Sequence, residues 1–405
     1  MAEKKTILVL GGGVGGQTAA NALAARLGRG HRIVLVERET DFSFSPSFLW
    51  IVTGERTPAR ICKPVAALLR PEVELIRADV AAVRPSERFV ETSAGRLEFD
   101  FLIISLGADL APGKVPGFEE AALNLYTLDG ASKIGKRLRT FASGRIAVLI
   151  CSSPFKCPAA PYEAAFLVKD LLAKSGAKAE VSVFTPEPFP MPTAGPEVGG
   201  ALKAMLEARG ITFHPNRKIA RVDAQAKTLC FEDGSSAGFD LLIGVPPHQA
   251  AKAAKESGLA NEAGWIPVDR ATMATKQSRV YAIGDAAAIA LAGGKSMPKA
   301  GVIAHAQAEI VADNVAAQCE GRNPDAAFDG EGWCAIELGA GSAAFGSGAF
   351  YVDPPQMRLY EPSVAWHWGK VLFERWWLAP FGRRRGALAL AMRLGGRLKG
   401  IKVRL

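Results

Sequence analysis

The sequence lacks several features that would assign its class at once. Its six cysteines, at positions 62, 151, 157, 230, 319 and 334, show no CxxC spacing, which argues against a zinc site and a disulfide scaffold. No apolar run is long enough to span a bilayer. The beginning, MAEKKTILVLGGG, has no apolar leader segment or cleavage site and enters a strand directly. The sequence therefore predicts a metal-free protein on the cytoplasmic side of the inner membrane, where any membrane contact is peripheral.

Acidic residues are absent from one long segment. Residues 382–405 contain eight Arg or Lys and no Asp or Glu, so of the net charge of +9 the rest of the chain carries 9 − 8 = +1. The basic character belongs to this segment and does not indicate a nucleic-acid-binding surface. With 405 residues, 49% hydrophobic and 22% charged, the chain has the composition of a folded protein of two or three domains.

Glycine is concentrated near the beginning. Residues 6–10 read as a strand, Gly11, Gly13 and Gly16 fit G-x-G-x-x-G, and a second strand ends in Glu37. The first glycine permits a tight turn, the second lets a pyrophosphate approach the backbone, and the third allows close packing, while an acid at position 37 accepts bonds from a ribose. The alternative is a plain glycine-rich turn, but strand, helix and acid together favour a dinucleotide site.

The chain then repeats itself. Residues 6–10 match residues 145–149, and residues 83–108 match residues 222–246, both at an offset close to 139. Residues 33–36 match residues 181–184 at an offset of 148. This pattern predicts two copies of one nucleotide-binding unit, the second inserted into the first. The second copy gains about nine residues between its first strand and the end of its helix, and Cys157 lies in that gain.

The second copy has lost its glycines. Their equivalents are Ile150, Ser152 and Phe155, and the equivalent of Glu37 is Thr185. Side chains there occupy the space that a pyrophosphate needs, so we expect this copy not to bind NAD(H) well. The alternative is an irregular loop that still binds it.

These observations predict an α/β protein with two nested Rossmann-like domains and a C-terminal amphipathic membrane-binding segment. The expected domains are a dinucleotide-binding domain, a second Rossmann-like domain with the cysteine loop, and a C-terminal region: 1–112 with 262–330, 113–261, and 331–405. The family resemblance given below implies FAD for the first domain and quinone and membrane binding for the last. A strand at 280–283 ends in Gly284 and Asp285, which can bond a ribityl chain, and a helix is expected over 297–318.

The chain resembles the sulfide:quinone oxidoreductases and the flavoprotein subunit of flavocytochrome c sulfide dehydrogenase, two groups of two-dinucleotide-domain flavoproteins. The resemblance covers essentially the whole chain. It rests on six motifs: GGGVGG with the acid at 37, FSFSPSFLW (42–50), PFKCPAAPYE (154–163), YAIGDAA (281–287), GWCAIELGAG (332–341) and KVLFERWW (370–377).

The resemblance implies roles for individual residues. Cys157 and Cys334 match two cysteines that form a redox disulfide or bridge extra sulfur, and Glu163 matches an acid near them. Lys370 and Phe373 match residues that line the quinone pocket. The flavin contacts implied in this way, beside those of the first glycine turn, are Gly107, Gly284, Asp285 and Lys299.

Two departures from the family pattern matter. Many of these enzymes have a third cysteine upstream of the cysteine loop, but residues 124–127 read Asn-Leu-Tyr-Thr. This leaves a two-cysteine arrangement, as in the flavocytochrome. That protein tethers its flavin through a cysteine, whereas FSFSPSF has none, so FAD is expected to be non-covalent.

The chemistry needs a thiolate near the flavin, a second thiol and a proton acceptor. Cys157 lies between Lys156 and a helix start, and both favour the thiolate. Glu163 either acts in acid–base chemistry or only caps the helix. The other cysteines are expected to be small buried hydrophobes, with Cys151 uncertain, and His305 is interpreted as a core or flavin-helix residue.

The C-terminal segment is the other functional element. Four tryptophans within 363–381 are typical of a membrane interface. Drawn as a helix, the basic tail has one apolar face flanked by arginines, with the apolar side chains of Ala387, Leu390, Leu394, Leu398, Ile401 and Leu405 beside Arg393, Arg397 and Arg404. Such a helix suits an anionic membrane surface. The alternative is a surface helix packed on a partner subunit, in a possible homo-oligomer.

The sequence thus predicts FAD-dependent oxidation of sulfide, or of a related sulfur species, with electrons passed to membrane quinone. The alternatives are a type II NADH:quinone dehydrogenase, a flavocytochrome c-like sulfide dehydrogenase with a protein acceptor, and a flavoprotein-like scaffold without enzymatic activity.

Overall fold

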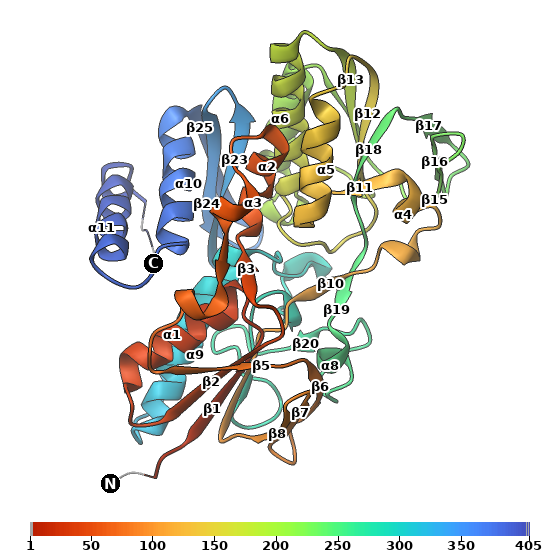
Figure 1. Cartoon of the computed structure of the whole chain (residues 1–405). Coiled ribbons are helices and arrows are strands. Elements are labelled where there is room, and N and C mark those ends of the chain that lie inside the picture. The colour runs from red at the N-terminus through yellow and green to blue at the C-terminus, as the bar shows by residue number, and fades with distance from the viewer. Residues whose placement is uncertain (1–2, 402, 404) are drawn as a thin grey trace.

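Two five-stranded parallel sheets organise the molecule, which we describe from a computed structural model covering residues 3–401, 403 and 405. The first sheet has the strand order β21 (Val280–Ala282), β9 (Phe101–Ile104), β1 (Thr6–Leu10), β2 (Arg32–Glu37) and β5 (Val73–Arg77). The second has the order β11 (Ala122–Asn124), β18 (Leu241–Val245), β12 (Ser143–Ile150), β13 (Lys178–Phe184) and β14 (Ile211–His214). Figure 1 shows the first sheet in the lower half of the molecule and the second in the upper half.

The predicted repeat is confirmed by these strands. Ile7 pairs with Ile33 in the first sheet, and Ile146 pairs with Val181 in the second, as offsets of 139 and 148 require. Each unit also has a three-stranded antiparallel sheet. In the first unit it lies between β5 and β9 and consists of β6 (Val80–Arg84), β7 (Phe89–Thr92) and β8 (Gly95–Glu98); in the second it lies between β14 and β18 and consists of β15 (Ile219–Asp223), β16 (Thr228–Phe231) and β17 (Ser236–Gly238).

One aspartate anchors the first strand of each unit in the same way. The carboxylate of Asp100 accepts from the backbone N–H of Thr6 at 2.7 Å, and that of Asp240 accepts from Arg145 at 2.8 Å. The offset between the two aspartates is 140, one more than at the first strand. The predicted domain limits at 112, 261 and 330 stay predictions, although all five strands of the second sheet lie between residues 122 and 245.

The insertion that carries Cys157 lies where the sequence placed it. In the first unit, residues 11–13 alone separate β1 from helix α1 (Val14–Leu27), whereas residues 151–159 separate β12 from helix α6 (Ala160–Ser175). The offset grows from 139 at Leu149 to 148 at Ser175, so the nine extra residues fall between these points.

Helix α9 (Gly301–Cys319) packs beside α1 against the first sheet. It begins four residues later than the predicted 297, because the residue before Pro298 is disfavoured in helical conformation and the chain stays extended up to Ala300. Strand β21 ends at Ala282, one residue before the predicted end.

A segment of the first unit reaches across to the second. It runs through β3 (Asp41–Ser43), α2 (Phe48–Thr53), α3 (Pro58–Ile61) and β4 (Cys62–Pro64). Helix α2 packs against α5 (Leu128–Leu138) and α6 of the second unit (Figure 1). The motif FSFSPSFLW is therefore part of the boundary between the two units.

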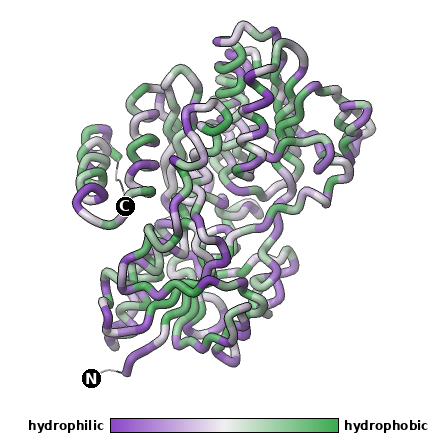
Figure 2. Tube along the Cα trace, in the orientation of Figure 1, coloured by the Kyte–Doolittle hydropathy of each residue, from purple (hydrophilic) through white to green (hydrophobic). Residues whose placement is uncertain are grey.

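The C-terminal region is an antiparallel sheet covered by two helices. Its elements are β23 (Glu331–Gly339), β24 (Ser342–Ala349), β25 (Gln356–Ser363), α10 (Val364–Trp377) and α11 (Arg383–Leu398). A buried ion pair between Arg56 and Glu374, at 2.9 Å, fixes α10 to the segment that follows α2. Helix α11 lies outermost beside α10 (Figure 1), and Figure 2 shows both polar and apolar residues along it.

The prediction for the basic tail was partly wrong. The helix ends at Leu398, and the chain turns back at Gly400 with φ of +69°, so Ile401 and Leu405 do not extend the apolar face. Leu405 instead packs against the core. Arg404 lies outside the described residues. Within the described part of the chain, no helix is both long and apolar enough to cross a membrane.

The remaining elements are four short strands, two one-turn helices and α7, which packs against β14 of the second sheet. They are β10 (Ala108–Leu110) paired with β19 (His248–Ala250), β20 (Ile266–Pro267) paired with β22 (Ala287–Ala288), and helices α4 (Phe118–Ala121), α7 (Pro196–Ala208) and α8 (Lys252–Lys255). The chain passes from the first unit to the second after β10 and returns after β18. Antiparallel pairing of β10 with β19 holds these two connecting segments together.

Candidate functional site

The glycine turn after β1 has the geometry that the sequence predicted. Gly11 adopts φ of +94°, and a Cβ on Gly16 would lie 1.8 Å from the carbonyl oxygen of Gly11, so neither position accepts a side chain. A Cβ on Gly13 would meet no atom within 4 Å. The carboxylate of Glu37 accepts a hydrogen bond from the backbone N–H of Gly12. Gly11 and Gly16 are therefore closely packed, whereas the space next to Gly13, where a pyrophosphate would approach, is open.

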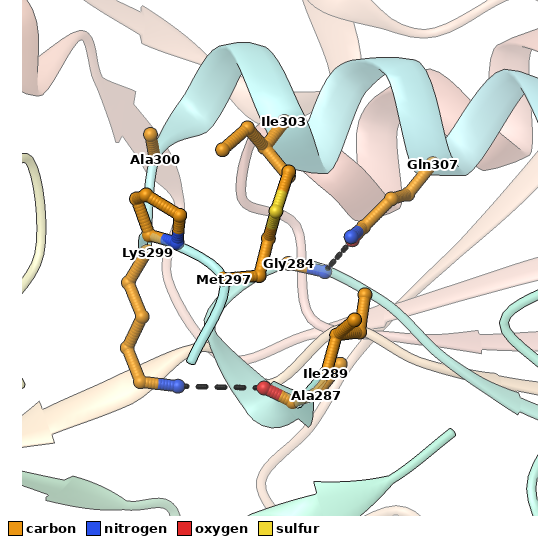
Figure 3. Close-up of a pocket in the computed structure, with 9 residues that line it drawn as sticks. Gly284, Ala287, Ile289, Met297, Lys299, Ala300, Ile303 and Gln307 are labelled. Carbon is orange, nitrogen blue, oxygen red and sulfur yellow. Dashed lines mark hydrogen bonds between the residues drawn. The ribbon is translucent and has the colours of Figure 1, made fainter. Parts of the chain in front are cut away.

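The second half of this candidate cofactor site comes from the segment before α9. Figure 3 shows the Lys299 side chain running from this segment toward Ala287, while Gln307 of α9 bonds the N–H of Gly284. The Lys299 ammonium donates to the carbonyl oxygen of Asp285 at 2.6 Å and lies 3.5 Å from the ring centre of Trp265. Burial lowers the pKa of Lys299 to about 8.

Lys299 thus braces the turn that carries Asp285, and its contact with a flavin stays a prediction. Burial raises the pKa of Asp285, and the ammonium groups of Lys299 and Lys156 oppose this effect. Gly107, with φ of +69°, follows β9, and a Cβ there would again find no atom within 4 Å.

The loop with Cys157 is tied to that same segment. The backbone N–H of Cys157 donates to the carbonyl oxygen of Lys299 at 2.6 Å, and Cys157 adopts a left-handed φ of +47°. The Tyr126 hydroxyl donates to the carbonyl oxygens of Lys156, at 2.7 Å, and Cys157, at 3.2 Å. Tyr126 belongs to the stretch where many of the resembling enzymes have their third cysteine, and here it positions the loop.

The elements next to Cys157 and Cys334 lie side by side despite the separation of the two residues in sequence. Helix α6, which follows the cysteine loop, packs against β23, which carries Cys334. Burial raises the pKa of Cys334 well above its ordinary value, and the nearby charge of Cys157 raises it further. Both thiols are half-buried, and neither forms a disulfide.

A buried ion pair lies beside the two cysteines. Glu163 of α6 accepts hydrogen bonds from the Lys370 ammonium of α10 and, at 2.8 Å, from the backbone N–H of Glu337 in β23. The side chains of Glu163 and Lys370 are 3% and 10% exposed, so water screens the pair little. Since the carboxylate reaches across to two other elements, Glu163 does more than cap its own helix.

The predicted low pKa of Cys157 is wrong for this arrangement. Burial raises the pKa of Cys157 to about 12, and the carboxylate of Glu163 raises it further. Lys370 and the backbone N–H of Ala160 oppose this effect. The helix start therefore acts in the expected direction, but Lys156 does not contribute, because its ammonium turns away to the carbonyl oxygen of Ala108 at 3.0 Å.

Charge balance around the ion pair is uneven. Burial raises the pKa of Glu163, and Lys370 opposes it. Burial disfavours the Lys370 ammonium, but Glu163 and Glu337 outweigh it and raise the pKa of Lys370. One ammonium group is therefore shared by two carboxylates, and the cluster attracts a further proton.

The second nucleotide turn is filled by protein. Ile150 is fully buried in β12, which it extends by pairing with Val245, and Phe155 is 3% exposed. Thr185, the equivalent of Glu37, is buried and bonds Glu187. These contacts use the space and the polar groups that a second dinucleotide would need.

An aromatic wall surrounds the predicted quinone residues. The ring of Phe373 lies 6.1 Å from Phe44, 5.1 Å from Trp333 and 5.7 Å from Trp376, between centroids. Lys370 lies 5.5 Å from the centre of the Trp50 ring. The site thus joins a buried charge pair to a large aromatic surface.

The remaining candidates behave as core residues. The His305 ring bonds the Thr18 hydroxyl at 2.9 Å, and burial lowers the pKa of His305 to about 4. Cys151 and Cys319 are buried in apolar surroundings, and burial raises the pKa of each. Cys62 and Cys230 are half-buried.

Sequence reasoning missed two polar residues, Glu337 and His367. The His367 ring bonds the Glu337 carboxylate at 2.9 Å. One signal was available, because position 367 is one helical turn before Lys370 and lies on the same side of α10.

Comparisons with known proteins show the family of this chain. The sequence model described as pyridine nucleotide-disulphide oxidoreductase matches residues 5–309. The sulfide-quinone reductase of Aquifex aeolicus (strain VF5) is 26% identical over 399 residues, which is 92% of this chain and 90% of that protein. The mitochondrial sulfide:quinone oxidoreductase of Mus musculus is 25% identical over 292 residues, 69% of this chain and 65% of that protein. This last match spans slightly less than two thirds of the mouse protein.

A solved structure has the same fold. The sulfide:quinone oxidoreductase from Aquifex aeolicus superposes with a TM-score of 0.81 at 21% identity, covering 96% of this chain and 92% of that one. The resemblance stated from the sequence motifs is thereby confirmed.

Gly13 offers a test of the cofactor site that leaves the fold intact. Its φ of −72° and ψ of −169° suit any residue, and the space around it is open, so Gly13→Asp should change the free energy of unfolding by less than about 1 kcal/mol. The added carboxylate would face the pyrophosphate of FAD, and we expect FAD affinity to fall at least about 100-fold. Fluorescence titration of the FAD-depleted protein measures this. Gly13→Ala is the uncharged control, and wild-type affinity in Gly13→Asp would exclude the site.

Alkylation of Cys157 tests the electrostatics of the buried pair. Because its pKa is about 12, the reaction with iodoacetamide should be slow at pH 8 and accelerate about tenfold per pH unit up to pH 11. Glu163→Gln removes a charge that raises the pKa of Cys157 and should speed alkylation at least about threefold. Lys370→Met should slow it. Mass spectrometry follows the Cys157 peptide, with Cys230 as internal control, and a change of the opposite sign would refute the arrangement.

Proposed function

Because the chain belongs to the pyridine nucleotide-disulphide oxidoreductase family, we propose that it is a flavoprotein enzyme that oxidises sulfide, or a related small sulfur species, and transfers the electrons to a membrane quinone. One observation carries this proposal. The turn that would hold a second dinucleotide is replaced by the loop that carries Cys157, near enough to Cys334 for its charge to raise the pKa of Cys334, and beside the buried Glu163–Lys370 pair.

The residues present fit a non-covalent FAD. The open space at Gly13 accommodates a pyrophosphate, the N-terminus of α1 favours its charge, and Glu37 has lone pairs for ribose hydroxyls. Asp285 and Gly284 lie across the site, before α9. Phe42 and Phe44 occupy the segment where the flavocytochrome has its tethering cysteine. Bound FAD supplies a two-electron acceptor that a thiolate can reduce and a quinone can reoxidise.

Cys157, Cys334 and Glu163 are proposed to handle sulfur. Two thiols in one place can hold a sulfur atom between them or close a disulfide. Both thiols rest protonated because of burial, so their reaction requires a base. Glu163 supplies one, since its carboxylate lies close enough to raise the pKa of both cysteines.

Lys370 and Phe373 are proposed to border the quinone. A quinone is a flat ring with two carbonyl oxygens, and it matches the aromatic wall around Phe373 together with a cationic donor at Lys370. Lys370 bonds Glu163 as well, so a single side chain links the sulfur residues to the proposed quinone position.

The NADH dehydrogenase alternative is disfavoured by the second unit. Buried Ile150, Phe155 and Thr185 fill the place of a nicotinamide dinucleotide. A protein electron acceptor, as in the flavocytochrome, remains the other candidate for the last step, and it is favoured only if purified enzyme reduces cytochrome c but not quinone.

Membrane contact is proposed through α11 and the outer face of α10. The Leu390, Leu394 and Leu398 side chains on α11 are 59%, 50% and 88% exposed, and Trp368 on α10 is 52% exposed. Apolar side chains next to many arginines suit an anionic lipid surface, and the cytoplasmic side is the one that the sequence predicts.

Replacement of either cysteine tests the sulfur chemistry. Cys157→Ser and Cys334→Ser should each lower sulfide-dependent quinone reduction at least about 1000-fold while FAD stays bound, because a hydroxyl cannot hold reducible sulfur. Stopped-flow absorbance follows flavin bleaching by sulfide and recovery on addition of a ubiquinone analogue. Cys230→Ser is the control and should keep the full rate. Equal rates in all three variants would exclude the cysteine assignment, and rapid bleaching by NADH would support the dehydrogenase alternative.

Vesicle binding tests the proposed membrane surface. Full burial of a leucine side chain is worth about 1.5–3 kcal/mol, so Leu394→Glu with Leu398→Glu should weaken partition at least about tenfold. Flotation with vesicles of phosphatidylglycerol and phosphatidylcholine measures this. Val352→Glu, at an apolar residue that is 38% exposed on another part of the surface, is the matched control. Wild-type flotation of the double variant would contradict the assignment to α11.

A further inference from the structure

A cavity of about 340 Å³ with a mixed polar and apolar lining opens near the buried ion pair. Its walls come from the end of α2, from α6, from the β23–β24 hairpin and from α10. The side chains that give it polar character are Thr53, Glu55, Asp170, Lys174, Glu337 and His367. This volume holds several water molecules.

Two of these residues connect the cavity to the interior. Glu337 is 2% exposed, and its carboxylate lies 2.9 Å and 3.1 Å, by its two oxygens, from Nδ1 of His367. The backbone N–H of Glu337 donates to Glu163 at 2.8 Å. His367 lies one turn before Lys370 on α10, and its side chain is 13% exposed. The imidazole of His367, which lines the cavity and bonds Glu337, therefore lies between the cavity and the Glu163–Lys370 pair.

We propose that His367 and Glu337 form a proton passage that joins the Glu163–Lys370 pair to the water of this cavity. The inference rests on the proposed function. Oxidation of the hydrosulfide ion, HS⁻, to zero-valent sulfur releases two electrons and one proton, whereas reduction of a quinone to the quinol takes up two of each, so one proton per turnover enters from water. The side chains of Glu163 and Lys370 are only 3% and 10% exposed, so a proton that reaches them from water needs a polar route through the structure.

The cluster has the charges that such a passage needs. The Lys370 ammonium bonds Glu163, and both Glu163 and Glu337 raise the pKa of Lys370, so a proton entering through His367 moves toward two acidic side chains. The charged groups that face the imidazole or the cavity are Lys370 on α10, Glu163, Asp170 and Lys174 on α6, Glu55 after α2, and Glu337 on β23. The Lys174 ammonium pairs with the Asp170 carboxylate at 2.7 Å on the exposed side of the cavity, so these two charges neutralise each other.

A purely structural role for the pair is the competing explanation, because the His367–Glu337 contact also holds α10 against β23. Trp50 packs edge-on against His367 at 6.1 Å between ring centroids, which would keep part of this packing after substitution. Chemical rescue separates the two roles. His367→Ala leaves a hole that is continuous with the cavity, and imidazole fits the hole and can exchange a proton, whereas pyrrole fits it and cannot act as a base.

We expect His367→Ala to lower kcat for sulfide-dependent quinone reduction at least about tenfold, with KM for sulfide and quinone changed less than about twofold. Imidazole should restore kcat at least about fivefold and raise the melting temperature of the variant, while pyrrole should raise the melting temperature alone. Glu337→Gln should also lower kcat and should not respond to imidazole. Lys174→Ala, on the wall of the same cavity, is the control and should keep kcat within about twofold.

Three outcomes would overturn the inference: wild-type kcat in His367→Ala across pH 6–9, rescue by pyrrole as strong as by imidazole, or loss of kcat in Lys174→Ala equal to that in His367→Ala. Failure of the proposed function looks different, because wild-type protein would then show no sulfide-dependent quinone reduction at all.

Discussion

The contact between Glu163 and Lys370 holds the functional half of the molecule together. It joins α6 of the second unit to α10 of the C-terminal region, and the backbone N–H of Glu337 brings β23 to the same carboxylate. Charges this deeply buried are costly to desolvate, by several kcal/mol per ion in real proteins, and the cost is recovered only with close geometry and further hydrogen bonds. The pair therefore favours the one packing in which the elements carrying Cys157, Cys334 and Phe373 meet.

The two nucleotide-binding units show how one architecture is adapted to two tasks. The four strands that repeat have the same order in both, and an aspartate anchors the first of them in the same way. They differ in the connection to the first helix, which is three residues long where Gly13 leaves space and nine residues long where Cys157 is presented. The sheet fixes the position of the helix, and the chemistry changes with the loop alone.

The architecture could be predicted from the sequence because repeated hydrophobic strands and a glycine fingerprint are local signals. The offsets of 139 and 148 located the insertion around Cys157, and the losses at Ile150 and Phe155 indicated a filled second turn. The pKa of Cys157 could not be predicted, since it depends on burial and on Glu163, which reaches it only in the folded structure. The end of α11 at Leu398 was missed because the return of the chain toward the core is a tertiary contact. Glu337 and His367 were missed for a similar reason, as β23 and α10 are separated by a hairpin.

The edge strands of the two sheets also constrain the order in which the chain can assemble on the ribosome. All strands of the second sheet emerge within residues 122–245, whereas the first sheet needs β21, at 280–282, to cover β9. Helix α9, the neighbour of α1, emerges later still. The N-terminal unit thus stays open at one edge throughout the synthesis of the unit inserted into it, and an uncovered strand edge is a template for wrong pairing. Nascent chains stalled before β21 would depend on the tunnel exit or on chaperones to protect that edge.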